Sequence, residues 1–271
     1  MRITFFGGGN MATALIGGLI NNGYPARDLA VIERNAESRE RLAKDFDVRC
    51  YGEPEAEALN CDVLILAVKP QQMREACAPL IGRLREQLVI SIAAGLRLTD
   101  LSRWLGGYFK LVRTMPNTPA LIGCGVTGLY ALPGVTEVER MGAERIMQAV
   151  GATLWVNDEA QIDAVTAVSG SGPAYVFLFI EALQKAATEL GFTPKQAHLL
   201  SIETVLGAAR LASHSEEPAS VLRERVTSKG GTTAAALQVM ADCGTVDGIV
   251  AGIHAAKARG VELGEQLGKD D

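Results

Sequence analysis

Short apolar segments alternate with segments of helical periodicity over the first 157 residues. The clearest apolar runs are Asp62–Val68 and Leu88–Ile92, and such unbroken runs are typical of strands buried on both faces of a parallel sheet. Weaker strand candidates are Arg2–Phe6, Ala30–Ile32, Val48–Tyr51, Lys110–Arg113, Gly125–Tyr130 and Thr153–Val156. Strands that alternate with helices predict an α/β fold of the Rossmann type, with a doubly wound sheet.

In the first part the segment Glu37–Asp45 is charged and amphipathic, whereas the helical segments of the second part are long and rich in Ala and Leu. We expect helices at Thr13–Ile20, Glu37–Asp45, Gln71–Leu80 and Glu137–Val150 and, after Asn157, at Ala174–Leu190, Pro194–Ala212, Thr232–Ala241 and Val246–Leu267. No convincing strand follows Asn157. The pattern therefore predicts a sheet domain at residues 1–157 and an all-α domain at residues 158–271.

In the second part, residues that end one helix and start the next are easy to recognise. Gly191 follows one predicted helix, Thr193 is a suitable N-cap, and Pro194 falls at the first position of the next helix. These helices are more apolar than a lone small bundle needs. We expect a helix-mediated dimer or larger assembly, with a well-buried monomeric bundle as the alternative.

A glycine-rich turn lies between the first predicted strand and the first helix. Gly7-Gly8-Gly9-Asn10-Met11-Ala12 fits the pattern G-x-G-x-x-A. The first glycine permits a sharp turn, the second lets backbone approach a pyrophosphate, and the alanine lets helix and strand pack closely. Because the turn follows a strand and precedes a helix, it predicts a dinucleotide site rather than an ordinary turn.

The residues after the second predicted strand give conflicting signals about the cofactor. Glu33 lies where an acid accepts hydrogen bonds from a ribose 2′-hydroxyl, which favours NAD. Arg34 follows directly and would pair with a 2′-phosphate, which favours NADP. The alternative is that both are solvated loop charges, and for Glu33 this interpretation fits as well as the functional one.

Composition excludes several other classes of function. A net charge of -5 without a basic stripe argues against a nucleic-acid partner. The apolar runs are too short to span a membrane, and no signal peptide precedes the first strand, so we expect a cytoplasmic protein. The five cysteines are scattered and form no C-x-x-C, which predicts reduced, buried thiols. The three histidines are isolated, and we expect no metal site.

Two further glycine loops precede helices in the second part. Ser169–Tyr175 opens one long helix, and Val226–Thr233 opens another. In the second loop the N–H groups of Gly230, Gly231 and Thr232 would lie at the positive end of a helix, a suitable position for a carboxylate. The alternative for each loop is a helix cap with a flexible approach.

These segments together resemble the pyrroline-5-carboxylate reductase family. The resemblance rests on Gly7–Ala12, Leu66–Gln71, Arg113–Pro119, Ser169–Tyr175 and Ser228–Thr233, which run from end to end of the chain. It implies reduction of the cyclic imine Δ1-pyrroline-5-carboxylate to L-proline, the last step of proline biosynthesis, with NADPH or NADH. It also implies a C-terminal helical domain that interlocks with its twin, in dimers that often assemble further into decamers.

The resemblance assigns roles to individual residues. For the cofactor it implies Phe6, Gly7, Gly8, Gly9, Asn10, Met11, Arg34, Ala67, Val68, Lys69, Pro70, Ala93 and Asn117. For the substrate it implies Glu159, Ser228, Gly230, Gly231, Thr232 and Thr233. The Thr233 hydroxyl is expected to reach the ring nitrogen of the imine and to polarise it or relay a proton. The sequence by itself reads Glu159 equally well as an acid at a helix N-terminus.

The chain departs from the family pattern in two places. Lys229 stands where the family usually has proline, which loosens the loop and adds a charge beside the proposed anion site. The segment Gly52–Glu55 lacks an asparagine that many members place near the adenosine ribose. Together with Glu33, its acidic residues weaken the case for a 2′-phosphate, so the preference for NADPH over NADH is slight.

Other functions fit the sequence less well. A β-hydroxyacid dehydrogenase needs a catalytic lysine near the start of the long helix, but the first lysine there, Lys185, lies more than about three turns in. A broader imine reductase stays open, because the anion site would serve any cyclic imino acid. A non-catalytic nucleotide sensor would need the glycine turn but neither Thr233 nor the second anion site.

Overall fold

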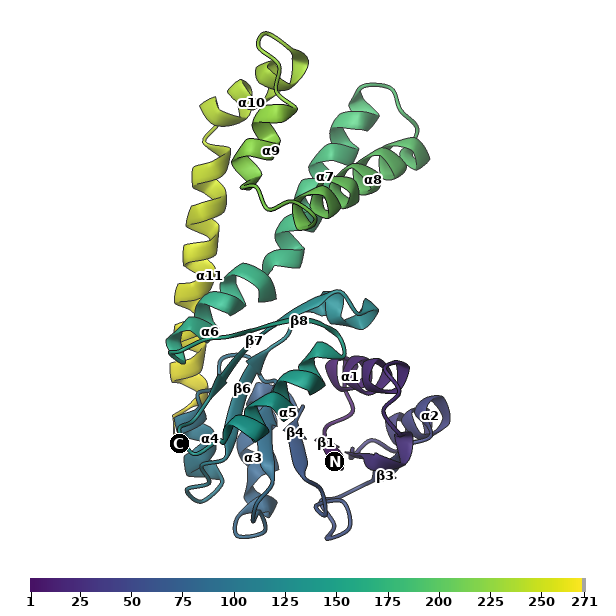
Figure 1. Cartoon of the computed structure of the whole chain (residues 1–271), viewed down its shortest axis with the longest axis vertical. Coiled ribbons are helices and arrows are strands. Elements are labelled where there is room, and N and C mark those ends of the chain that lie inside the picture. Colours follow the sequence, from purple (N-terminus) through teal and green to yellow (C-terminus); the bar gives the residue numbers. More distant parts are fainter. Residues whose placement is uncertain (270–271) are drawn as a thin grey trace. The chain divides into compact units, whose positions relative to one another are not determined.

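The computed structural model describes residues 1–269, which divide into two compact units (Figure 1). Unit 1 comprises residues 1–171 together with the C-terminal residues from Ala256 onward, and unit 2 comprises Gly172–Ala255. All strands of the described chain belong to unit 1. Unit 2 is entirely helical outside its turns.

Unit 1 is built on a sheet of eight strands in the order β3-β2-β1-β4-β5-β6-β7-β8. The strands are β1 Ile3–Phe6, β2 Leu29–Ile32, β3 Arg49–Tyr51, β4 Val63–Leu66, β5 Leu88–Ser91, β6 Leu111–Met115, β7 Gly125–Ala131 and β8 Gly151–Trp155. Neighbours are parallel except for β6 and β7, which are antiparallel. The chain order reverses at β1, where β2 lies on one side and β4 on the other. This is the position at which doubly wound sheets bind ligands.

Helices cover both faces of the sheet. Successive residues of a strand point to opposite faces, and in the central strands the residues on both faces are apolar. Ile3 and Phe5 of β1 belong to one buried cluster with residues of α1 (Asn10–Asn21), α2 (Ala36–Phe46) and α5 (Glu137–Gln148). Phe6 belongs to the second cluster, with residues of α3 (Met73–Cys77) and α4 (Leu98–Trp104). The expected doubly wound α/β fold is thereby confirmed.

The predicted helix Gln71–Leu80 is interrupted. It consists of a 3₁₀ turn at Pro70–Gln72, the short α3, and a second 3₁₀ turn at Ala78–Leu80. Pro79 accounts for the second break, because proline lacks the N–H that a continuing α-helix would use. Helix α4 was not expected from the sequence. Its seven residues are too few for a clear periodic signal.

The compact units divide later than the boundary predicted near Asn157. After β8 the chain forms α6 (Ala160–Val165) and a π-helical turn (Thr166–Gly170), in which Ile162, Asp163 and Ala167 are buried within unit 1. The end of α11 (Thr245–Leu267) also belongs to unit 1, where Leu267 packs on the second cluster. Asn157 therefore marks the end of the sheet, and the division into domains 1–157 and 158–271 stays a prediction.

Unit 2 contains α7 (Gly172–Glu189), α8 (Pro194–Ser213), α9 (Ala219–Arg225), α10 (Thr232–Asp242) and the first part of α11. Helices α7 and α8 pack on each other across the turn at Gly191, whose φ is +96°. Thr193 caps α8 by accepting a hydrogen bond from the Gln196 N–H, and Pro194 occupies the first turn. The predicted stop and restart at this turn is confirmed.

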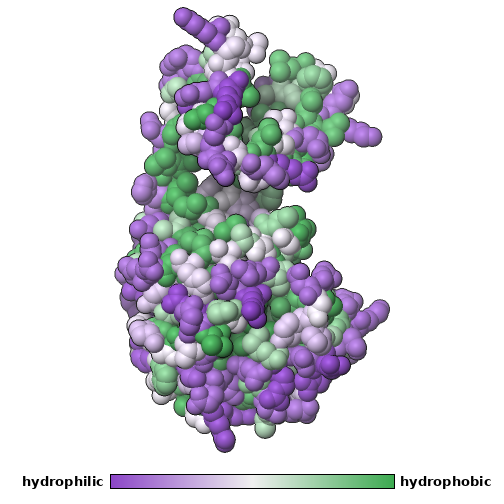
Figure 2. Space-filling model, viewed as in Figure 1, coloured by the Kyte–Doolittle hydropathy of each residue, from purple (hydrophilic) through white to green (hydrophobic). Residues whose placement is uncertain are grey.

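Unit 2 exposes an unusual amount of apolar surface. Only Ala197 and Ser201 are buried among its described residues. Phe177, Leu178 and Phe179 of α7 are at least half exposed, and apolar patches are visible on these helices in Figure 2. Large exposed apolar patches mark association surfaces in soluble proteins.

One described stretch, Ala160–Glu189, reaches the length and mean hydropathy (1.2) of a membrane span. Length and composition alone are weak evidence for a span. The first part of this stretch is α6, whose buried Asp163 is paired with Arg113 inside unit 1. The remainder carries the exposed apolar surface of α7, which self-association also explains.

The five cysteines form no disulfides. Cys61 and Cys77 are buried and Cys50 is partly buried, and burial raises the pKa of the Cys77 thiol to about 12. Cys124 and Cys243 are exposed, so the expectation of burial is wrong for these two. Among residues 1–269, no three His, Cys, Asp or Glu side chains are grouped as metal ligands.

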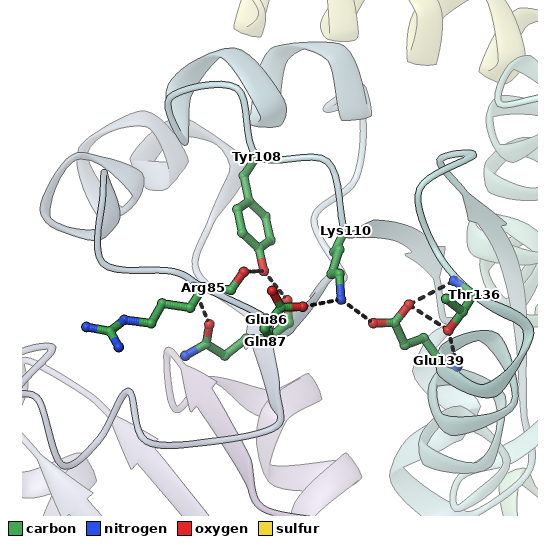
Figure 3. Close-up of polar contacts among 7 residues, drawn as sticks. All are labelled: Arg85, Glu86, Gln87, Tyr108, Lys110, Thr136 and Glu139. Carbon is green, nitrogen blue, oxygen red and sulfur yellow. Dashed lines mark hydrogen bonds and ion pairs between the residues drawn. The ribbon is translucent and has the colours of Figure 1, made fainter.

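Lys110 joins three segments at the edge of unit 1 away from the glycine turn (Figure 3). Its Nζ donates to Glu86 Oε2 (2.7 Å) and Glu139 Oε1 (3.0 Å). The other oxygen of Glu139 accepts from the N–H and the hydroxyl of Thr136 (2.8 Å each), which caps α5. Burial raises the pKa of Glu139, but these hydrogen bonds outweigh it, and the net shift is downward.

We expect Glu139→Gln to lower the free energy of unfolding by about 1–2 kcal/mol at pH 7, because it weakens both the cap and the ion pair. The folded-state pKa of Glu139 lies below its unfolded value, so the stabilisation is present above about pH 5 and is lost as pH falls through the folded pKa. Urea unfolding of the wild type and Glu139→Gln from pH 7 to about pH 3, at fixed protein concentration, measures this effect. The difference between their free energies of unfolding should become smaller as the pH falls. Glu137→Gln, an exposed change in the same helix, serves as control, and a pH-independent difference would contradict the assignment.

Candidate active site

A cavity of about 230 Å³ opens where β1, β2 and β4 end. Parallel strands end at one edge of a sheet, so the segments after these three strands converge there. Eight residues expected to bind the cofactor line the cavity, namely Phe6, Gly7, Gly8, Gly9, Arg34, Ala67, Val68 and Lys69. Ile32, Glu33, Gln72, Glu75 and Ala76 complete the lining.

The glycines of the turn are required for different reasons. Gly7 has a φ of +107°, and a Cβ there would lie 2.7 Å from the carbonyl oxygen of Ala67. A Cβ on Gly9 would meet nothing within 4 Å, so this residue leaves open space beside the turn. The geometry therefore explains glycine at position 7 by the turn, and use of the space beside Gly9 by a ligand stays a prediction.

The N-terminus of α1 offers free N–H groups at the turn. Asn10 and Met11 are its first two residues, and its N-cap, Gly9, has no side chain to accept their hydrogen bonds. The first turn contains no acidic residue. An uncapped helix N-terminus has partial positive charge and favours an anion such as a pyrophosphate.

The charged residues after β2 have defined partners. The two carboxylate oxygens of Glu33 accept from the N–H groups of Gly8 (2.8 Å) and Asn35 (2.9 Å). The Arg34 guanidinium forms an ion pair with Glu75 (2.5 Å). The hydrogen bond to Glu75 raises the pKa of Arg34, which is therefore charged at any physiological pH.

Five residues predicted to bind the cofactor lie outside the lining of this cavity. Asn10 and Met11 are the first two residues of α1. Pro70 opens the 3₁₀ turn after Lys69. Ala93 is buried just after β5, where its N–H donates to the hydroxyl of Ser91. Asn117 donates to the carbonyl of Ser169 (3.1 Å) and accepts from the N–H of Val126 (2.9 Å). The Asn117 side chain thus ties β7 to the π-helical turn, and contact of these residues with a nicotinamide stays a prediction.

Glu159 takes part in a structural network within unit 1. Its Oε1 accepts from the N–H of Leu98 (2.7 Å), the first residue of α4, and from Arg113 (3.3 Å). The other terminal nitrogen of Arg113 donates to Asp163 (2.7 Å). Glu159 is the N-cap residue of α6, which matches the alternative interpretation of it as an acid at a helix N-terminus. Its side chain makes no capping hydrogen bond to α6 and instead accepts from the first N–H of α4.

Sequence reasoning missed Asp163 and the central position of Arg113. The Arg113 side chain is 2 % exposed, and a buried guanidinium requires paired carboxylates. Arg113 lies within β6, directly after two apolar residues, and a charged residue in an apolar strand could have predicted an acidic partner. The identity of the partners, more than about forty residues along the chain, depends on the tertiary fold.

The residues expected to bind the substrate carboxylate lie together in unit 2. Gly231 is the N-cap of α10 and lacks a capping side chain, and its N–H donates to the carbonyl of Ser228 (3.0 Å). Gly230 has a φ of +72°, which suits glycine at this turn. Ser228, Gly230 and Thr232 are exposed, and Thr233 is half-buried in the first turn of α10. Helix α10 thus begins without a capping side chain, and binding of an anion by this loop stays a prediction.

Comparison with known families matches both parts of the chain. The family described as "Pyrroline-5-carboxylate reductase dimerisation" matches residues 159–263. The family described as "NADP oxidoreductase coenzyme F420-dependent" matches residues 2–95, which include the glycine turn. These matches support a nicotinamide cofactor and self-association through the C-terminal helices.

Individual proteins are similar over nearly the whole chain. Pyrroline-5-carboxylate reductase from Pseudomonas aeruginosa is 46% identical over 99% of this chain and 98% of its own. A solved pyrroline-5-carboxylate reductase from Coxiella burnetii is 43% identical, with a TM-score of 0.92 over 97% of this chain and 98% of its own. The Plasmodium falciparum pyrroline carboxylate reductase, solved with NADP bound, is 28% identical, with a TM-score of 0.87 over 97% of this chain and 98% of its own. The chain therefore belongs to the pyrroline-5-carboxylate reductase family of NAD(P)-dependent oxidoreductases.

Proposed function

We propose that this protein reduces Δ1-pyrroline-5-carboxylate to L-proline by hydride transfer from NAD(P)H, the last step of proline biosynthesis. The observation that carries the proposal is the cavity at the glycine turn, in a chain that is similar to reductases of this name from end to end. The space beside Gly9 and the uncapped N-terminus of α1 fit a dinucleotide pyrophosphate.

The cofactor we propose is NADPH, with NADH as the alternative. Arg34 lines the cavity and would pair with a 2′-phosphate, and the Plasmodium falciparum relative was solved with NADP bound. The proposed cofactor-binding residues are Phe6, Gly7, Gly8, Gly9, Asn10, Met11, Arg34, Ala67, Val68, Lys69, Pro70, Ala93 and Asn117. The N–H groups at the uncapped start of α1, those of Asn10 and Met11, are proposed to bind the pyrophosphate, and the other residues are proposed to orient the dinucleotide along the strand ends.

The reduced nicotinamide supplies the hydride, so the protein has to bind and orient the cofactor and the imine and provide for the proton. We propose that the N–H groups of Gly230, Gly231 and Thr232, with Ser228, bind the substrate carboxylate. The N–H of Gly231 donates to the carbonyl of Ser228 and has to exchange that partner for the carboxylate. The Thr233 hydroxyl donates a hydrogen bond to the ring nitrogen and steadies its charge as the amine develops. A threonine hydroxyl is a weak acid, so the proton comes from water or is already present on the imine. Glu159 stays a proposed substrate residue.

The dehydrogenase alternative lacks its catalytic lysine. Lys185 of α7 is exposed and pairs with Glu189 one turn later (2.6 Å), and this hydrogen bond raises the pKa of its ammonium group. A lysine that acts as a proton donor to an alkoxide is usually buried, with a lowered pKa. A reductase of broader range, acting on other cyclic imino acids, stays a candidate because the anion site recognises only the carboxylate.

For the assembly, we propose a dimer formed through the helices of unit 2, with a decamer as the larger form. The exposed apolar side chains of α7 and the dimerisation match support this arrangement. Light scattering after size exclusion would distinguish the two sizes. We also propose that the protein is cytoplasmic.

The proposal predicts cofactor oxidation that depends on the substrate carboxylate. Purified protein should oxidise NADPH or NADH with Δ1-pyrroline-5-carboxylate, and the carboxylate-free analogue 1-pyrroline should have a kcat/KM about 30-fold lower. This ratio corresponds to the loss of about 2 kcal/mol of charge-assisted hydrogen bonding. Cofactor absorbance measures both rates. Binding of cofactor without oxidation would contradict the catalytic proposal and favour a nucleotide sensor.

A further inference from the structure

Charged side chains of both signs line the cavity at the glycine turn. Arg34 and Lys69 are its cations, and Glu33 and Glu75 are its carboxylates. Glu33 is held by the N–H groups of Gly8 and Asn35. Glu75, in contrast, directs its carboxylate to Arg34, at a distance of 2.5 Å between Nη1 and Oε1.

The pair of Arg34 and Glu75 joins two walls of the cavity. Arg34 follows β2, whereas Glu75 lies in α3, which follows β4. The side chains are 57% and 67% exposed, so a ligand that enters the cavity reaches both. An ion pair at this exposure has little net stability, and another anion displaces its carboxylate at small cost.

A phosphate and a carboxylate compete for the same guanidinium edge. Arginine binds both groups through the same planar set of donors. A cofactor whose 2′-phosphate binds Arg34 has to displace Glu75 or lie beside its negative charge. A cofactor with an unmodified 2′-hydroxyl has no such conflict.

We propose that Glu75 modulates cofactor specificity by holding Arg34, which lowers the preference for NADPH relative to NADH. Glu75 is thus a positioning residue that acts through Arg34. The inference rests on the proposed function only in that the cavity binds NAD(P)H, and the ratio between the two cofactors tests it separately from the overall rate.

The test compares kcat/KM for NADPH and NADH in the wild type, Glu75→Gln, Arg34→Gln and the double variant. We expect Glu75→Gln to raise the ratio of kcat/KM for NADPH to that for NADH about fivefold, mainly through a lower KM for NADPH. A fivefold change corresponds to about 1 kcal/mol, the cost of displacing the Glu75 carboxylate from Arg34. In the Arg34→Gln background the same change should alter the ratio less than about twofold, because the guanidinium is absent. Glu75→Asp retains the carboxylate and should restore part of the wild-type ratio.

Glu57→Gln provides a matched control. Glu57 forms a similarly exposed pair with Arg49 (3.4 Å), and neither residue lines the cavity. This variant should leave the ratio unchanged. An unchanged ratio in Glu75→Gln would overturn the inference, as would an equal effect in both backgrounds, which would indicate direct repulsion without Arg34. If no variant oxidises either cofactor, the proposed function fails, and the ratio of NADP⁺ to NAD⁺ dissociation constants from calorimetry still decides the role of Glu75.

Discussion

Gly9→Val is expected to weaken cofactor binding by about 100-fold or more while the protein remains folded. The residue has φ of -71° and ψ of -178°, an extended conformation that valine adopts readily, and a Cβ there would meet no protein atom within 4 Å. The added side chain would instead occupy the space beside the N–H groups of α1. Loss of two charge-assisted hydrogen bonds to a pyrophosphate accounts for a change of this size.

The measurement is calorimetric titration with NADPH, together with the thermal unfolding midpoint. Gly142→Val is the matched control, because it adds the same side chain to α5, away from the cavity. Gly7 is unsuitable for this test, since a side chain there would collide with backbone of Ala67 and disturb the fold itself. Unchanged cofactor affinity in Gly9→Val would exclude the glycine turn as the pyrophosphate site.

The sheet could be predicted from the sequence because its physical signal is local. β4 and β5 are short apolar runs between polar turns, and burial on both faces requires that pattern. The antiparallel pairing of β6 and β7 could not be predicted from the composition of the strands. A short 3₁₀ turn, Thr118–Ile122, connects these strands, and strand direction depends on the path of the connection rather than on the composition of the strands.

The site was predictable where one contiguous segment makes the geometry. Gly7 and Gly9 illustrate this case, since the turn, the open space and the uncapped helix all lie within a few residues. The partners of charged residues were not predictable, because they come from distant segments. The conflict between Glu33 and Arg34 is an example. The sequence places them side by side, whereas the fold directs one to the glycine turn and the other to Glu75.

The same distinction applies to Glu159. Family resemblance assigns it to the substrate, and the structure of unit 1 shows its carboxylate engaged by α4 and Arg113. Helix α4 follows the turn at Ala93, which is a proposed cofactor residue. The carboxylate thus binds the start of α4 and the buried Arg113, and these partners come from segments that the sequence alone does not bring together.

Thr233→Val is expected to lower kcat about 100-fold, with little change in the dissociation constant of the cofactor. Valine has nearly the same shape and lacks only the hydroxyl, so the loss measures the hydrogen bond proposed to reach the imine nitrogen. Thr233 is the second residue of α10, and the N–H groups proposed to bind the carboxylate remain in this variant. KM for the imine should therefore change much less than kcat.

Thr233→Ser retains the hydroxyl and is the matched comparison, with an expected kcat within about tenfold of the wild type. Steady-state oxidation of NADPH with Δ1-pyrroline-5-carboxylate over a range of pH gives both parameters for each variant. If the hydroxyl only relays a proton that water also supplies, the defect of Thr233→Val should diminish at low pH, where the imine is already protonated. If the hydroxyl steadies the developing amine, the defect should be the same at every pH. Full turnover and unchanged KM in Thr233→Val would exclude both roles, and the anion site formed by Gly230 and Gly231 would then act without a side-chain partner at the ring nitrogen.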